Sequence, residues 1–215
     1  MAYMNYDYKD AIAECKKVDD LVAASGSTAP SVWSACVTGA TMEMTEGNHD
    51  PAAWERAKPE YLPQDDLLMP CDAAYVPNEV RPACYSYITA RLFEAAGATR
   101  GIPSPDAYPK AFSYCDAIPK TDTESRDACY GGFGGDFVYF ASGDARALES
   151  MSDKKIKDVY AWCALADNPD GVLSCEQNAL DTLFWGGENS PHAALAFCRL
   201  APSLGFADIC YQQLV

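Results

Sequence analysis

Apolar residues recur along most of the chain at the spacing of one helical face. Between residues 153 and 166, Ile156, Val159, Tyr160 and Cys163 fall on the same side of such a helix. No stretch alternates apolar and polar residues as a half-buried strand would, and no Asn-Gly or Asp-Gly turn joins two β-branched runs. The pattern therefore predicts an all-α protein.

Helix-start signals divide the apolar segments into pairs of short helices. Thr121–Glu124 fits the capping box, in which a hydroxyl and a carboxylate satisfy free amides of the first turn. Asn168-Pro169 places an N-cap before a proline that needs no hydrogen-bond acceptor. Further starts are predicted at Pro30, Asp50-Pro51, Ser142-Gly143-Asp144 (a run through Leu148), Ser190-Pro191 and Pro202-Ser203.

Ten cysteines form five close pairs along these helices. In chain order they are Cys15 and Cys36, Cys71 and Cys84, Cys115 and Cys129, Cys163 and Cys175, and Cys198 and Cys210. The pairs enclose 20, 12, 13, 11 and 11 residues, and no C-x-x-C spacing suggests a zinc ribbon or a thioredoxin motif. We expect disulfides between neighbours across each hairpin, although the sequence alone permits other pairings. Disulfides indicate an oxidising, extracytoplasmic compartment.

The cysteine pairs also mark an internal repeat. Three of the second cysteines are followed directly by tyrosine, and the first cysteines of the second to fourth pairs are 44 and 48 residues apart. The expected units are residues 6–46, 64–97, 106–140, 153–186 and 190–215, within a single domain. We predict that five disulfide-linked helical hairpins stack into a short α-solenoid-like array.

An A-x-x-x-C element recurs at Ala11–Cys15 and Ala111–Cys115, and each of these cysteines has a second cysteine downstream. In this respect the chain resembles the extracytoplasmic, disulfide-linked helical-repeat proteins of bacteria, the Sel1-like cysteine-rich type. The resemblance is one of architecture and covers most of the chain. It implies a binding role and assigns no functional residue.

The charge of the chain excludes several classes of partner. The formal net charge is −15, so the surface repels nucleic acid and anionic lipid. No apolar stretch approaches the roughly 18 residues that a membrane helix needs, so we expect no membrane insertion. Residues 1–14 carry four charged side chains and no apolar core of a secretion signal. We therefore expect a periplasmic or secreted protein whose signal peptide has been removed.

The segment Cys129–Phe137 conflicts with the helix expected in this unit. Its four glycines each cost a helix about 1 kcal/mol relative to alanine, and such conflicts are typical of functional or strained sites. One interpretation is a ligand pocket around Gly131–Gly135, and the candidate binding residues are Tyr130, Gly132, Phe133, Gly134 and Asp136. The favoured alternatives are a close approach of two helices or a break in the helix. A phosphate-binding loop is not indicated, because no strand precedes the glycines and no Lys-Ser/Thr follows.

A second candidate segment brings together an aromatic side chain, a carboxylate and an imidazole. Its binding candidates are Trp185, Glu188 and His192. The simpler interpretation is that Gly186 and Gly187 end one helix and that Ser190-Pro191 begins the next.

Metal and catalytic signals are weak. The turn Asp167–Gly171 lacks the spacing of an EF-hand, and the loops Asn48–Asp50 and Gln64–Asp66 are acidic without a full set of ligands. We therefore predict no metal site and no cofactor. No G-x-S-x-G motif occurs, and cysteines committed to disulfides offer no thiol nucleophile, so no catalytic residue is predicted.

The leading hypothesis is a non-enzymatic extracytoplasmic binding or scaffold protein that acts through a helical-repeat surface. Its partner, a protein or a small molecule, is not identified by any motif. One alternative is an enzyme or a small-molecule carrier with a site around Gly131–Gly135. The other alternative is an acidic metal-binding protein.

Overall fold

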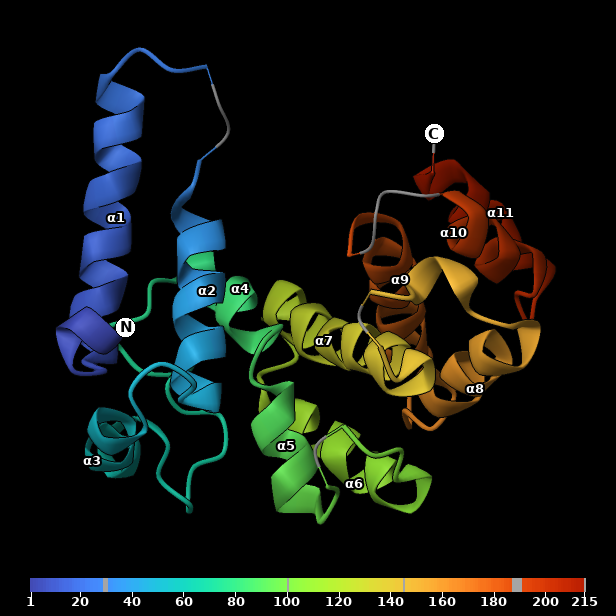
Figure 1. Cartoon of the computed structure of the whole chain (residues 1–215), viewed down its shortest axis with the longest axis horizontal. Helices are drawn as coiled ribbons and strands as arrows, with labels where there is room; N and C mark the ends of the chain where they lie inside the picture. Colours follow the sequence, from blue (N-terminus) through green and yellow to red (C-terminus); the bar gives the residue numbers. More distant parts are fainter. Residues whose placement is uncertain (29–30, 100, 145, 187–190, 215) are drawn as a thin grey trace. The chain divides into compact units, whose positions relative to one another are not determined.

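The computed structural model describes residues 1–28, 31–99, 101–144, 146–186 and 191–214. Every regular element within these ranges is a helix, so the predicted all-α class is confirmed. None of the described helices is long and apolar enough to cross a membrane. The chain divides into two compact units, Met1–Arg91 and Leu92–Val215, and each is described by itself (Figure 1).

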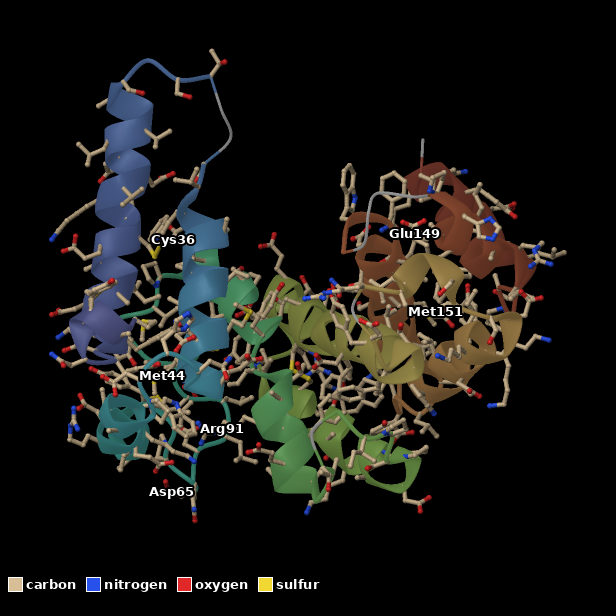
Figure 2. All side chains as sticks on the ribbon, viewed as in Figure 1. Cys36, Met44, Asp65, Arg91, Glu149 and Met151 are labelled. Carbon is tan, nitrogen blue, oxygen red and sulfur yellow. A yellow bond between two sulfur atoms is a disulfide. The ribbon has the colours of Figure 1, made fainter. Side chains whose placement is uncertain are left out.

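The α-helices described in the first unit are α1 (Tyr8–Ala24), α2 (Trp33–Glu46), α3 (Pro51–Tyr61) and α4 (Arg81–Tyr85). α1 and α2 lie side by side (Figure 1). The Cys15–Cys36 disulfide joins them, and Figure 2 shows Cys36 between the two helices. Tyr8, Val37 and Met44 are fully buried, so the apolar core of this unit runs along the α1–α2 pair.

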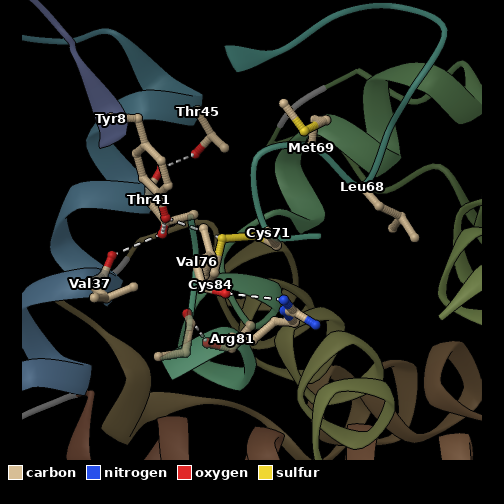
Figure 3. Close-up of a disulfide and its surroundings, with 12 residues drawn as sticks. Tyr8, Val37, Thr41, Thr45, Leu68, Met69, Cys71, Val76, Arg81 and Cys84 are labelled. Carbon is tan, nitrogen blue, oxygen red and sulfur yellow. Dashed lines mark hydrogen bonds between the residues drawn. A yellow bond between two sulfur atoms is a disulfide. The ribbon is translucent and has the colours of Figure 1, made fainter. Parts of the chain in front are cut away.

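A buried polar chain connects α1 to α2 and to the second disulfide of this unit. The hydroxyl of Tyr8 lies 2.6 Å from Thr41 Oγ1 on α2 and 3.2 Å from Cys84 Sγ on α4 (Figure 3). Thr41 also donates to the carbonyl oxygen of Val37 at 2.9 Å. Because Tyr8 and Thr41 are completely buried, these partners compensate for the water that both hydroxyls lose on folding.

The second predicted hairpin, in residues 64–97, is helical only in its second half. The first helix of this predicted hairpin is absent, because Cys71 and its neighbours lie in a stretch of turns between α3 and the 3-10 helix Asn78–Val80, so this part of the expectation is wrong. Pro70 and Pro77 fall within the stretch, and each lacks the amide donor that a helix interior needs. The disulfide to Cys84 nevertheless forms.

The α-helices described in the second unit are α6 (Tyr108–Ser113), α7 (Thr123–Ser142), α8 (Asp153–Cys163), α9 (Pro169–Trp185), α10 (Pro191–Arg199) and α11 (Leu204–Gln213), and α5 (Thr89–Ala96) crosses the division between the units.

An aromatic core lies along α7. Phe133 is fully buried there, and its ring centroid lies 4.5 Å from that of Phe112 and 4.8 Å from that of Phe93. Phe137 continues this core one turn later.

Side-chain caps begin several helices where the sequence indicates them. Asp50 caps α3, Asn168 caps α9 and Ser203 caps α11, each by accepting a hydrogen bond from the backbone amide three residues ahead. The capping box predicted at Thr121 is wrong. Asp122 caps α7 instead, because the carboxylate one residue later accepts from the third amide of the helix.

The helical run expected from Ser142 through Leu148 is also wrong. Ser142 is the last residue of α7, and Gly143 adopts the left-handed conformation with φ = 72°. Its amide donates to the carbonyl oxygen of Tyr139 at 2.8 Å, which ends the helix in a manner typical of glycine. Among the described residues between α7 and α8, the one helical element is the 3-10 helix Leu148–Ser150.

All five disulfides predicted between sequence neighbours are confirmed. The pairs are Cys15–Cys36, Cys71–Cys84, Cys115–Cys129, Cys163–Cys175 and Cys198–Cys210, with Cα–Cα distances of 5.4 to 5.9 Å. All ten cysteines lie within the described residues and none is free. Stacking of five such hairpins into a solenoid-like array stays a prediction.

Candidate functional site

Helices α7 and α9 meet in backbone contact at Gly134. A Cβ atom placed there would lie 1.9 Å from the carbonyl oxygen of Cys175 and 2.9 Å from the amide nitrogen of Ala179, so only glycine fits. Gly131 and Gly135 also face α9. Of the two structural alternatives considered for this segment, the close approach of helices is confirmed and the break in the helix is wrong, because α7 is continuous.

The two helices run in the same general direction. Near their N-termini, Gly171 of α9 lies against the ring of Tyr130 of α7. Near their C-termini, Gly186 lies close to the hydroxyl of Tyr139. The N-terminal halves of α7 and α9 therefore lie on the same side of the contact at Gly134.

A pocket of about 470 Å³ lies between these N-terminal halves. Its lining residues are Lys120, Thr123, Arg126, Asp127, Tyr130, Asn168, Asp170, Leu173, Ser174 and Gln177. The volume is typical of a small-molecule site. All of these residues belong to the second unit, and most come from α7 or α9.

Tyr130 forms a fixed part of the pocket wall. Its hydroxyl donates to Asp116 Oδ1 at 2.7 Å and accepts from Asn168 Nδ2 at 2.9 Å. Burial raises the pKa of Tyr130 to about 12, and the hydrogen bond to Asp116 acts in the same direction, so the phenol stays protonated at neutral pH. Asn168 also caps α9 through its Oδ1 atom, which accepts from the Gly171 amide at 2.6 Å. Asn168 thus links the Tyr130 hydroxyl to the first turn of α9 by hydrogen bonds.

Arg126 fixes the wall beside Tyr130, because both side chains donate to Asp116 Oδ1. Its guanidinium donates to the carbonyl oxygens of Cys115 and Ile118, at 3.3 and 2.9 Å, and to both the carbonyl and the carboxylate of Asp116. The side chain is only 14% exposed. Because its donors are largely occupied by the turn before α7, Arg126 acts mainly as a rigid part of the wall.

The other candidates around Gly131–Gly135 do not line this pocket. Phe133 is part of the aromatic core, Gly134 packs against α9, and Gly132 is buried within α7. Asp136 is half-buried one turn further along the helix. Among the candidates predicted from this segment, only Tyr130 lies at the pocket.

The second candidate segment lies at the other end of α9. Trp185 is the last residue of α9 and is 69% exposed, with its ring 4.7 Å from that of Phe184. His192 is an exposed residue in the first turn of α10. Glu188 lies outside the described residues. α9 has 17 residues and is about 25 Å long, so Trp185 and the pocket are separate features of this helix.

Most of the pocket residues carry no signal in the sequence. Thr123, Arg126, Ser174 and Gln177 occupy ordinary half-buried or exposed positions of two helices. The cap at Asn168 was recognised only as a helix start. Nothing in the local sequence shows that α7 and α9 are neighbours, because that relationship arises from a glycine contact between distant segments.

No group of three or more His, Cys, Asp or Glu side chains within the described residues could hold a metal ion. In the acidic loop at His49, the polar groups bond one another within the first unit. His49 Nδ1 lies 2.6 Å from Glu43 Oε2, and the His49 amide donates to Oε1 at 3.0 Å. Tyr6 donates to the same carboxylate. Burial alone would raise the pKa of Glu43, but these hydrogen bonds outweigh it and hold the pKa below its usual value.

The loop at Asp66 is likewise occupied by protein contacts. The guanidinium of Arg91 donates to the carbonyl oxygen of Asp66 at 2.9 Å and to that of Met69 at 3.0 Å. It also donates to the carbonyl oxygen of Pro63. Arg91 therefore closes the turns around Cys71 through backbone acceptors, and Figure 2 labels it beside Asp65 of the same loop.

A buried carboxyl lies on another face of α9. Glu176 is 4% exposed, and neither a hydrogen bond nor an ion pair links its side chain to another described residue. Burial raises its pKa to about 7. The hydroxyl of Tyr160 on α8 is near enough for the Glu176 charge to raise the pKa of that tyrosine further.

In comparisons with known proteins, no family model, no curated protein and no solved structure matches the chain. What the pocket binds is therefore inferred from its own residues.

Proposed function

We propose that the chain is an extracytoplasmic binding protein, and that its principal binding site is the pocket between the N-terminal halves of α7 and α9. The observation that carries this proposal is a cavity of about 470 Å³ whose wall is fixed by Tyr130 and Arg126 before any ligand arrives. A pre-formed wall reduces the entropy that a ligand must overcome on binding. Hydrogen-bonding groups with few internal partners complete the lining.

Five disulfides support the extracytoplasmic part of the proposal. Intrachain disulfides are typical of proteins in oxidising compartments and rare in the cytosol. Closing loops of this length stabilises each hairpin by roughly 3 kcal/mol in the chain-entropy model, which suits short helices that are marginal in isolation. We propose the periplasm or the exterior of the cell as the location.

The test is a ligand screen by NMR with the isotopically labelled, oxidised protein. Mixtures of sugars, amino acids, organic acids and nucleosides are added, and shifts of backbone amides locate any binding. The variant Ser174→Tyr fills the pocket from α9, and Ala161→Tyr places the same side chain at an exposed position of α8. We expect shifts at Tyr130 and Gln177 that persist in Ala161→Tyr and disappear in Ser174→Tyr. Binding that survives Ser174→Tyr, or that maps elsewhere, would contradict the proposal.

A second candidate function is the binding of a protein partner through a helical-repeat surface. The exposure of Trp185 favours it, because tryptophan is enriched among the residues that contribute most to binding at protein interfaces. In this proposal the five hairpins stack as an array, and its surface acts as a scaffold. The variant Trp185→Ala then weakens partner binding and leaves the pocket shifts unchanged, which separates the two functions.

A further inference from the structure

The pocket is lined by charged side chains of both signs, and the positive charge of Arg126 is already paired with Asp116. Lys120 and Arg126 carry positive charge, and Asp127 and Asp170 carry negative charge. The chain as a whole has a net charge of −15. A ligand with net negative charge is repelled by the protein and finds no excess of positive charge here. A ligand with net positive charge meets the positive charge of Lys120 in the lining.

The remaining lining residues offer both donors and acceptors. The hydroxyls of Thr123 and Ser174 each donate and accept, and the amide of Gln177 does both as well. The side chains of these three residues form no hydrogen bond with another described residue, so they are available to a ligand. Leu173 and the ring of Tyr130 add apolar surface. Such a lining matches hydroxyl groups on an apolar carbon frame.

We propose that the pocket binds a neutral, polyhydroxylated molecule of the size of a mono- or disaccharide. This inference rests on the proposed function and specifies the ligand class of the same site. A pocket that hydrogen-bonds hydroxyl groups rejects analogues that lack them, because its polar atoms are then left without partners. The volume of about 470 Å³ is compatible with this size of ligand.

The experiment compares probes of similar shape and different charge by NMR titration. The probes are glucose and maltose, then glucuronate with one negative charge and glucosamine with one positive charge. Glutamate, lysine and inorganic phosphate serve as charged probes without a sugar frame. We expect glucose or maltose to shift the amides of Ser174 and Gln177, with an affinity that changes less than about twofold between low and high salt.

The variant Asp127→Asn tests the balance of charge. It removes one negative charge from the lining, so glucuronate should gain several-fold in affinity relative to glucose. A charged probe that binds the unmodified pocket more tightly than every neutral sugar overturns the inference and leaves the proposed function intact. If no sugar shifts the pocket amides but another class of ligand from the screen does, the inference is likewise overturned and the proposed function stays intact. Absence of any binding at the pocket overturns both.

Discussion

The Cα atom of Gly134 in α7 lies against the backbone of Cys175 in α9, where a Cβ would be 1.9 Å from the carbonyl oxygen. The contact involves main-chain atoms, which cannot move aside as a flexible side chain can. We expect Gly134→Ala to lower the free energy of unfolding by about 3 kcal/mol, at the upper end of the cost of overpacking. Chemical denaturation of the oxidised protein measures this loss.

Gly39→Ala is the matched control for this substitution. Gly39 is an exposed residue within α2, and a Cβ there meets no atom within 4 Å. Alanine should therefore stabilise α2 by about 0.5 to 1 kcal/mol, because it restricts the unfolded chain and favours the helix. Equal effects of the two substitutions would show that helix propensity, and not the contact with α9, governs position 134.

The glycine segment shows why part of the fold could not be predicted from the sequence. Local propensity correctly predicts that glycines destabilise an isolated helix. The close packing of α7 against α9 offsets this loss, and the contact is made by Cys175, about 40 residues after Gly134. Disulfide pairing could be predicted, because two cysteines 12 to 14 residues apart across a helical hairpin have few other geometries. The turns around Cys71 were mistaken for a helix, because an apolar run outweighed the prolines beside it.

Tyr130→Phe tests the network that fixes the pocket wall. The variant removes a hydroxyl that bonds Asp116 and Asn168 and leaves both polar groups short of a partner. We expect a loss of about 1 to 2 kcal/mol in the free energy of unfolding and a weaker affinity for the pocket ligand. Tyr114→Phe is the control, because its hydroxyl donates to the Ala95 carbonyl at 3.2 Å, away from the pocket lining. A similar loss of affinity in both variants would argue against a positioning role for Tyr130.

Removal of either of two disulfides that close loops of the same length distinguishes an effect on stability from an effect on the pocket. Cys163–Cys175 and Cys198–Cys210 each span a sequence separation of 12, so replacing either pair by alanine should cost a similar amount, roughly 3 kcal/mol. Cys175 follows the pocket residue Ser174 and contacts Gly134. Only the first replacement should therefore shift the amides of the pocket and reduce ligand affinity, as measured by NMR. Equal changes at the pocket in both variants would contradict this assignment.

The pocket itself was beyond prediction from the sequence for a physical reason. The lining residues on α7 and α9 fit the local pattern of their helices, so no violation of that pattern marks them in the sequence. The site exists because two helices that meet at Gly134 hold their N-terminal halves on the same side. Tyr130 was identified only because it adjoins the glycines, and Trp185 was identified by its type although it lies at the far end of α9.

The first unit should lose stability in acid through Glu43. Hydrogen bonds from Tyr6 and from both the amide and the imidazole of His49 outweigh burial and hold the pKa of Glu43 below its unfolded value. A lowered pKa contributes stability that is present above the unfolded pKa, near 4.5, and is lost as the pH falls through the folded pKa. Hydrogen exchange of the α2 amides, measured as a function of pH, should show this loss. In Glu43→Gln the loss should be absent, and protection at neutral pH should be weaker.

The second unit should show the opposite dependence through Glu176. Its pKa is raised to about 7 by burial, so the folded state holds the proton more tightly than the unfolded state does. The associated stability is fully present below the unfolded pKa of about 4.5 and is lost as the pH rises through about 7. Hydrogen exchange of the α9 amides should therefore accelerate as the pH rises from about 4.5 to about 7.

Glu176→Gln should abolish the pH dependence of α9, because a neutral amide of the same shape never acquires a buried charge. It should also make the second unit more stable than the unmodified protein above pH 7. Glu55→Gln, a change on the exposed face of α3, is the control and should leave the profile of α9 unchanged. An α9 profile that keeps its slope in Glu176→Gln would assign the proton to another group. Because Glu43 and Glu176 act in opposite directions, each unit should be the less protected one at a different end of the pH range.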